Sequence, residues 1–255
     1  MMKRILFATD LDNTLLFSHR HRQPGDRCAE LWNGAEQGFF TPETVDLLPQ
    51  AARQVRLLPI TTRSIAQYQR IRWPAGALPR EALTANGAVL LRDGEIDRDW
   101  YDQSWELVRA HQGALRDLLE RISAREDVTS ARIVENMYVY AACSDAAAAE
   151  RCAAAWAQDA SFQMEVSGRK VYWFPPGIDK GTALRRAAGR YRPERILCAG
   201  DSVIDVPMLR RADLAMIPDG TLLPALPAER TLVCQENVRF PDFVLRTVLA
   251  QAGPG

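Results

Sequence analysis

The chain has 255 residues, of which 47% are hydrophobic and 25% charged. This is enough for one large or two modest globular domains, and the composition excludes a disordered chain. Lys plus Arg and Asp plus Glu number 32 each, so the charge gives no indication of nucleic acid or a membrane surface as partner. Because no apolar stretch could cross a bilayer and no signal peptide precedes the first apolar run, we expect a cytoplasmic protein; its oligomeric state stays open.

The cysteines indicate neither a disulfide framework nor a zinc site. They are odd in number and lack CxxC spacing, so we expect reduced, mostly buried thiols. They are Cys28, Cys143, Cys152, Cys198 and Cys234.

The first predicted element is a strand over residues 5–8, and it ends in Asp10-Leu11-Asp12-Asn13-Thr14. Open α/β sheets place their chemistry at the carboxyl ends of strands. Residues i and i+2 of an extended segment point the same way, so Asp10 and Asp12 can converge on one reacting group. Taken alone, this stretch is more often a structural turn.

Residues 18–40 follow the acid pair and are open to two interpretations. The segment is either a flap over the acid pair that carries His19-Arg20-His21-Arg22, or a solvated loop. No further Cys or His lies nearby to complete a metal site around the two histidines.

The next elements alternate between strand and helix, which predicts a parallel sheet. Thr41-Pro42 starts a helix that runs to residue 54. A strand over 55–60 leads into Thr61-Thr62-Arg63-Ser64, and a short helix covers 64–71. Two short apolar runs, 82–84 and 88–91, then flank the turn signal Asn86-Gly87.

The pattern changes after residue 97. Helical spacing over 105–122 precedes a strand region over 131–142 with a turn at Glu135-Asn136, and an alanine-rich helix covers 146–157. Residues 162–166 and 170–174 form a predicted hairpin. This part is therefore an α+β insert of one helix and two strands, repeated once.

The last two motifs restore the earlier pattern. Gly177-Ile178-Asp179-Lys180-Gly181 precedes a helical segment, and the strand 195–199 ends in Gly200-Asp201-Ser202-Val203-Ile204-Asp205. The ordered set of acid pair, hydroxyl, lysine and acid pair suits phosphoryl transfer. Clustered carboxylates repel one another unless a cation such as Mg²⁺ lies among them, and a carboxylate can serve as nucleophile.

With these four motifs in order, the chain resembles the haloacid dehalogenase superfamily, whose pattern is DxDxT, a strand-terminal Thr or Ser, a Lys, and GDxxxD. The resemblance covers essentially the whole chain. It implies Asp10 as nucleophile and Asp12 as general acid and base. It further implies that Thr61 holds the phosphoryl oxygens and that Lys180 neutralises nucleophile and phosphate.

The same resemblance implies a Mg²⁺ site. Asp201 would bind the ion together with Asp10 and the backbone carbonyl of Asp12, and Asp205 would bind it or orient a metal-bound water. The last motif has Ile204 where many relatives have Asn, which removes an amide from the site.

The implied fold is a Rossmann-like doubly wound parallel core over residues 1–97 and 176–255, with an inserted α+β cap (αββαββ) over 98–175. The position and order of the insert resemble the large cap of the branch called subfamily IIB, which includes sugar-phosphate phosphatases and phosphomannomutase. The second motif has Thr62 where Gly is common. We expect Thr62, Arg63 and Asn86 to contact substrate.

The core chemistry is shared across such a superfamily, so only groups outside it can select the leaving group. The cap residues to search first lie at predicted strand ends and turns, although each alone is more often a solvated surface residue. They are Arg132, Glu135, Asn136, Tyr138, Arg169 and Lys170.

The sequence thus predicts a Mg²⁺-dependent phosphatase that hydrolyses a small phosphorylated metabolite through an aspartyl-phosphate. Two alternatives stay open. A phosphomutase would use the same aspartate and return the phosphoryl group to a sugar, and a catalytically silent sensor or scaffold would keep only the fold.

Overall fold

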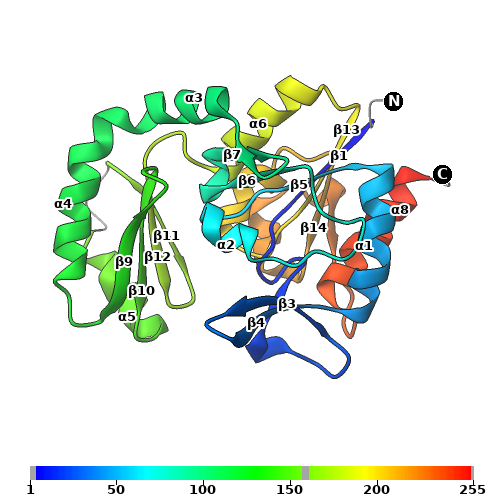
Figure 1. Ribbon diagram of the computed structural model, residues 1–255, viewed down its shortest axis with the longest axis horizontal. Coiled ribbons are helices and arrows are strands. Elements are labelled where there is room, and N and C mark those ends of the chain that lie inside the picture. The colour runs from blue at the N-terminus through cyan, green and yellow to red at the C-terminus, as the bar shows by residue number, and fades with distance from the viewer. Residues whose placement is uncertain (1–3, 157–160, 254–255) are drawn as a thin grey trace.

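The computed structural model describes residues 4–156 and 161–253, and Figure 1 shows a core with a smaller lobe beside it. The core is built on a parallel sheet of five strands in the order β15-β14-β13-β1-β5. Its strands are β1 (Ile5–Thr9), β5 (Arg56–Pro59), β13 (Arg195–Ala199), β14 (Leu214–Ile217) and β15 (Thr231–Val233). The central strands read as continuous apolar runs because helices bury both of their faces.

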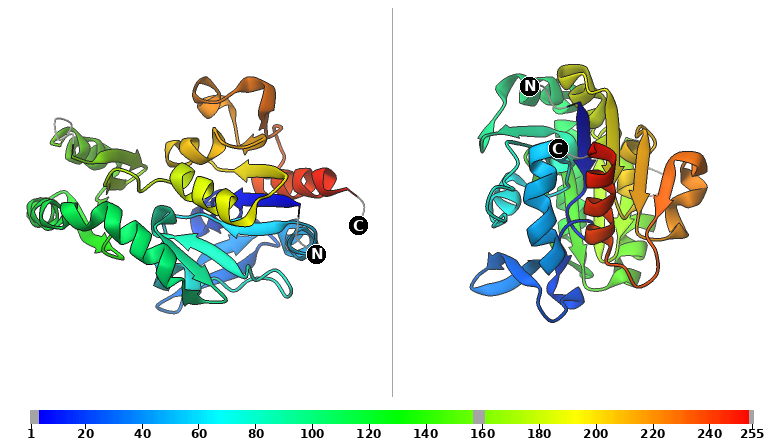
Figure 2. Two further views of the ribbon diagram at one scale, coloured as in Figure 1. Left: turned by 90° about the horizontal axis from the view of Figure 1, so that it is seen from above. Right: turned by 90° about the vertical axis from the view of Figure 1, so that its right-hand side faces the viewer.

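Helices cover the two faces of this sheet, which confirms the predicted doubly wound fold. Helices α1 (Pro42–Gln54) and α8 (Phe240–Ala252) lie side by side, as Figure 2 shows, and Phe7 packs in their cluster. The next residue, Ala8, packs in the cluster of α6 (Lys180–Tyr191) and α7 (Val206–Leu209). Successive side chains of a strand point to opposite faces, so β1 contributes to both layers.

A small antiparallel sheet extends one edge of the core. It consists of β6 (Glu81–Thr84), β7 (Val89–Arg92) and β8 (Glu95–Ile96), and a parallel bridge between Ile60 and Leu83 joins it to the residue after β5. The predicted turn at Asn86-Gly87 is confirmed, since both residues have positive φ angles. The helix predicted over 64–71 is shorter and forms α2 (Ile65–Gln69).

The segment after the acid pair is folded, so its interpretation as a solvated loop is wrong. Strands β2 (Phe17–Ser18), β3 (Arg27–Trp32) and β4 (Ala35–Phe40) form an antiparallel sheet in the order β2-β4-β3, here called the flap sheet. The intervening 3₁₀ turn His19–His21 is exposed.

The smaller lobe follows the predicted order of helix, two strands, helix and two strands. Its helices are α3 (Arg98–Val108), α4 (Gln112–Ser123) and α5 (Ala146–Ala154), and its strands are β9 (Val128–Val134), β10 (Tyr138–Cys143), β11 (Gln163–Ser167) and β12 (Lys170–Phe174). The strands form one antiparallel sheet in the order β11-β12-β10-β9. We call residues 98–174 the cap; the domain boundaries predicted at 98 and 175 stay a prediction.

Two helix predictions in the cap were inaccurate. The helix predicted over 105–122 is interrupted at Arg109–His111, and Figure 1 shows α3 and α4 running in different directions. The apolar spacing continues through the break, but α3 packs on the core through Trp100, whereas α4 packs on the cap sheet through Leu118. The helix predicted over 146–157 ends at Ala154, and residue 157 lies outside the described residues.

One face of the cap sheet is covered by α4 and α5, which pack on Val139 and Trp173. The opposite face carries Tyr138, Tyr140 and Tyr172 and is directed toward the core. All five cysteines are free, as expected. Within residues 4–156 and 161–253, no helix is both long and apolar enough to traverse a membrane.

Candidate active site

The register of the core sheet brings the predicted motifs to one edge. Thr9, the last residue of β1, lies opposite Pro59 on one side and Ala199 on the other. The backbone N–H of Asp10 donates to the carbonyl of Ala199 at 2.9 Å. The residues that follow these three strands therefore converge.

A tight turn shapes the acid-pair loop. Asn13 has a φ angle of +62°, which Asn tolerates better than most residues, and its backbone N–H donates to Leu16 at 2.7 Å. The turn leaves Asp10 buried at 6% exposure and Asp12 half-buried at the rim.

Lys180 joins the two acidic motifs. Its Nζ lies 2.5 Å from Oδ1 of Asp10 and 2.5 Å from Oδ1 of Asp205, and the residue is 2% exposed. Burial lowers the pKa of Lys180, but Asp10 and Asp205 outweigh that effect and the pKa is raised. Lys180 therefore stays protonated and supplies a buried positive charge beside Asp10.

Asp205 organises the second acidic loop. Its Oδ2 accepts hydrogen bonds from the backbone N–H of Asp201 at 3.1 Å and from the N–H and Oγ of Ser202 at 3.0 Å each. A Cβ at Gly200 would lie 2.5 Å from the Cβ of Asp205, so this close approach requires glycine. With Oδ1 on Lys180, both oxygens of Asp205 have donors.

The donor set fits a hard divalent cation. Carboxylate oxygens of Asp10, Asp201 and Asp205 lie within 4.8 Å of one another. Within the described part of the chain, the oxygens of Asp201 have only long contacts, to Asn13 at 3.4 Å and to Thr14 at 3.3 Å, and so are available to a metal. All-oxygen ligands with room for water and phosphate suit Mg²⁺.

The electrostatics of this cluster also favour a cation. Burial raises the pKa of Asp10 to about 7, with Asp205 and Asp12 adding to the rise and Lys180 opposing it. Burial, Asp205 and Asp10 raise the pKa of Asp201 to about 8. Each carboxylate resists ionising beside the others, and a bound cation would relieve that repulsion.

Thr61 is fully buried, and its Oγ1 accepts a hydrogen bond from the backbone N–H of Arg63 at 3.2 Å. Thr62 lines a cavity of about 60 Å³ that also contains Asp10, Lys180 and Asp201, and Ile204 forms part of the same wall. Ile204 is buried and gives this cavity an apolar patch where the resemblance would have placed an amide.

Arg63 contacts Asp12. Its Nε donates to Oδ2 of Asp12 at 2.9 Å and its Nη2 donates to Oδ1 at 2.7 Å. Burial raises the pKa of Asp12, but Arg63 outweighs that effect and the pKa is lowered to about 2. In this arrangement Asp12 is a carboxylate held at the rim of the site.

Glu30 of the flap sheet was not singled out from the sequence. It is 3% exposed and pairs with Nη1 of Arg63 at 2.9 Å and with Nη2 of Arg70 at 2.8 Å. An acidic residue between the apolar residues Ala29 and Leu31 was the available signal. Its partners are distant in the chain, so the sequence did not reveal the pairing.

Asn86 lies behind the site. It is 1% exposed, its Nδ2 donates to the carbonyl of Ile178 at 3.3 Å, and its backbone N–H donates to Thr61. Neither of the two cavities described for this site includes it in its lining. The contacts place Asn86 as a support for the Thr61 loop, and the prediction that it binds substrate stays untested.

A larger cavity of about 570 Å³, here called the cleft, opens between the cap sheet and the flap sheet beside Asp12. Three of the cap residues selected from the sequence line it, namely Arg132, Tyr138 and Lys170. The other three do not line it. Glu135 accepts from the N–H of Ile65, Asn136 contacts Tyr101 and Arg169 contacts Ser144. The hydroxyl of Tyr138 donates to the carbonyl of Thr62 at 2.6 Å and so joins cap to core.

The fold of the chain also occurs in known proteins of solved structure. Neither a scan of family models nor a search of curated sequences gives a match. Among solved structures, the chain is similar to a sucrose-phosphatase from Synechocystis sp. PCC6803 in complex with sucrose and phosphate, at 17% identity and a TM-score of 0.65 over 98% of each chain.

Two further structures are similar over most of their length. One is the C-terminal domain of a trehalose-6-phosphate phosphatase from C. albicans, at 16% identity and a TM-score of 0.60 over 99% of this chain and 93% of that one. The other is a haloacid dehalogenase-like hydrolase from B. subtilis, at 17% identity and a TM-score of 0.57 over 95% and 99%. The chain therefore has the core-and-cap fold of these phosphatases and hydrolases.

Proposed function

We propose that the chain is a haloacid dehalogenase-type phosphatase that hydrolyses a small phosphorylated metabolite, with Mg²⁺ as cofactor and Asp10 as nucleophile. The observation that carries the proposal is the position of Lys180, which is shared at 2.5 Å between Asp10 and Asp205 within the carboxylate cluster. Among the solved structures of similar fold are two whose names identify them as sugar-phosphate phosphatases, which supports this substrate class.

In the first step, one oxygen of Asp10 attacks phosphorus and the bond from phosphorus to the leaving-group oxygen breaks. Asp12, protonated after it releases at least one hydrogen bond to Arg63, gives its proton to that oxygen, so the alcohol leaves neutral. Lys180 and Thr61 stabilise the charge on the nucleophile and on the equatorial phosphoryl oxygens. In the second step Asp12 takes a proton from water, the water attacks phosphorus, and phosphate and the Asp10 carboxylate are released.

Asp10, Asp201 and the backbone carbonyl of Asp12 would hold the Mg²⁺, and Asp205 would fix Asp201 and Lys180 around it. When bound, the cation supplies positive charge to the phosphoryl oxygens as the transition state forms. The nucleophilic attack and the two proton transfers depend on the side chains of Asp10 and Asp12.

The test is phosphate release from a panel of sugar and polyol phosphates, with Mg²⁺ and with a chelator. We expect turnover of some member with Mg²⁺ and none with the chelator or in the Asp10→Asn variant. Retained activity in either case would overturn the mechanism. Formation of an isomeric sugar phosphate in place of free phosphate would instead identify a phosphomutase, and a folded protein inert toward every ester would favour the silent scaffold.

A further inference from the structure

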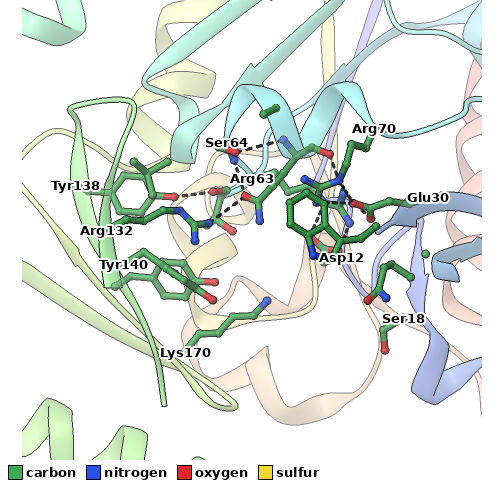
Figure 3. A pocket seen from close by; sticks show the side chains of 18 of the residues that line it. Asp12, Ser18, Glu30, Arg63, Ser64, Arg70, Arg132, Tyr138, Tyr140 and Lys170 are labelled. Atoms are coloured by element: carbon green, nitrogen blue, oxygen red, sulfur yellow. Dashed lines mark hydrogen bonds and ion pairs between the residues drawn. The ribbon is translucent and has the colours of Figure 1, made fainter. Parts of the chain in front are cut away.

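The cleft has a charge pattern that the hydrolytic chemistry does not use. One wall is the open face of the cap sheet and the other is formed by α2 and the flap sheet. Figure 3 shows Arg132, Tyr138, Tyr140 and Lys170 reaching into it from the cap, opposite Arg70 and Glu30. The phosphoryl site adjoins the cleft at Asp12, which belongs to both cavities.

The cations on the core side of the cleft are neutralised. Arg63 pairs with Asp12 and Glu30, and Arg70 pairs with Glu30 and stacks over the ring of Trp32 at 4.4 Å. These charges therefore serve the internal network that holds Asp12.

The cations on the cap side form no ion pair with any described residue. Within the described part of the chain, neither Arg132 nor Lys170 has a carboxylate within ion-pair distance. Arg132 makes one long contact with Oε1 of Gln67, at 3.5 Å. Two positive charges that lack an ion-pair partner among residues 4–156 and 161–253 therefore face the space that a leaving group must occupy.

The two cations lie at different depths. Lys170 lines both the cleft and the small cavity that holds Asp10 and Lys180, so it belongs to the phosphoryl end. Arg132 lines only the cleft, and in the sheet register it lies opposite Tyr140 on β10. Its guanidinium stacks over the Tyr140 ring at 4.6 Å, which orients the planar group. Among the described residues only its Nη2 has an acceptor, the long contact to Gln67, so its other edge N–H donors can meet a ligand.

Resting on the proposed function, we propose that Arg132 is a specificity residue which binds an anionic group on the leaving group of the substrate. The substrate is then a phosphate ester with a second negative charge, either a carboxylate or a second phosphate. An arginine fork matches both anions through paired N–H donors. The hydroxyls of Tyr140 and Tyr172 and the amide of Gln67 lie along the cleft to meet the carbon chain between the two charged ends.

The experiment compares matched esters that differ only in this second charge. Glycerol 3-phosphate is paired with 3-phosphoglycerate to test the carboxylate, and fructose 6-phosphate is paired with fructose 1,6-bisphosphate to test the phosphate. We expect kcat/KM to be about ten-fold or more higher for the anionic member of at least one pair. In Arg132→Gln that preference should fall about ten-fold or more while the neutral member changes little.

The control variant is Arg116→Gln, which removes an exposed arginine of α4 on the far side of the cap sheet and should leave the ratio unchanged. Arg132→Lys keeps the charge without the fork and should restore part of the preference. An equal loss of kcat/KM for neutral and anionic esters in Arg132→Gln would show that Arg132 only holds the cap to the core through Gln67, and would overturn the proposal.

A binding measurement separates this proposal from the proposed function. The Asp10→Asn variant is titrated with each ester by calorimetry, with and without the Arg132→Gln change. Tighter binding of an anionic member that is lost with Arg132 supports the anion site even if no ester is hydrolysed. Turnover of neutral esters without any anionic preference in rate or binding would overturn the anion site and leave the phosphatase intact.

Discussion

Arg63 holds Asp12 through two parallel hydrogen bonds, at 2.9 Å and 2.7 Å, and Glu30 holds Arg63 from behind at 2.9 Å. The pairing explains why the pKa of Asp12 is lowered to about 2 despite burial, which raises it. An acid with that pKa carries no proton near neutral pH. Asp12 must therefore release at least one hydrogen bond to Arg63 before it can protonate a leaving group.

Replacement of Arg63 tests this relationship. In Arg63→Gln, Asp12 loses both its orientation and its charge partner, and we expect kcat to fall on the order of 10²-fold, the lower range for a general acid and base. Arg63→Lys keeps the positive charge but not the paired N–H donors, so its kcat should lie between those of Arg63→Gln and the wild type. Steady-state kinetics with the best ester measures both, and unchanged kcat in Arg63→Gln would show that Asp12 is positioned by other groups.

The role of Glu30 illustrates what the sequence could and could not predict. The strand-end motifs around Asp10, Thr61 and Asp201 were recognisable because each lies within a few residues of an apolar run, and parallel strands align their carboxyl ends. The flap sheet has no such local signature. Its strands pair through contacts such as that of Phe17 with Phe39, and Glu30 acquires its partner only when the chain is folded.

The same limit applies to the cap. The order of its elements could be predicted from the alternating helix and strand patterns. The break between α3 and α4 could not, because α3 packs on the core and α4 packs on the cap sheet, and one straight helix cannot follow both surfaces. Half of the cap residues selected from the sequence line the cleft. The sequence could not separate them from the other half, because the side of each turn that faces the core depends on how the cap packs against the core.

A second prediction concerns Lys180, which is buried between two carboxylates. In Lys180→Met the charges of Asp10 and Asp205 are left buried without their partner, which typically destabilises a protein by about 3–5 kcal/mol. Thermal unfolding should show a clear loss of stability together with loss of phosphate release. Adding Asp205→Asn to the variant should recover part of the stability and none of the activity. A Lys180→Met protein as stable as the wild type would contradict the assigned charge state.

The third prediction follows from the raised pKa values of Asp10 and Asp201, about 7 and about 8 against an ordinary value of 3.8. A carboxyl whose pKa is higher in the folded than in the unfolded state stabilises the fold at low pH, and this contribution is lost as the pH rises through the folded pKa. The melting temperature of the metal-free protein should therefore be lower at about pH 8.5 than at about pH 5.5.

Mg²⁺ should reverse that effect, because the cation favours the ionised carboxylates and displaces their protons. The rise in melting temperature on adding Mg²⁺ should be larger at the higher pH. Asp201→Asn removes one of the repelling charges, so its metal-free form should lose less stability with rising pH and respond little to Mg²⁺. A Mg²⁺ response independent of pH would argue against carboxylate ligands with raised pKa values.

The fourth prediction compares two glycines of α6. A Cβ at Gly181 would lie 2.4 Å from the carbonyl oxygen of Pro207. Among the described residues, a Cβ at Gly189 would meet no atom within 4 Å beyond its chain neighbours and the backbone of its own helix. Gly181→Ala should push α6 away from α7 and displace Lys180, the neighbouring residue, at a cost of about 1–3 kcal/mol. Gly189→Ala has the same chemical change in the same helix and should stabilise the protein by up to about 1 kcal/mol. Denaturant unfolding of the two variants measures the difference, and phosphate release should fall only in Gly181→Ala. If both variants had the same stability and activity, the close approach of α6 to Pro207 would not be what positions Lys180.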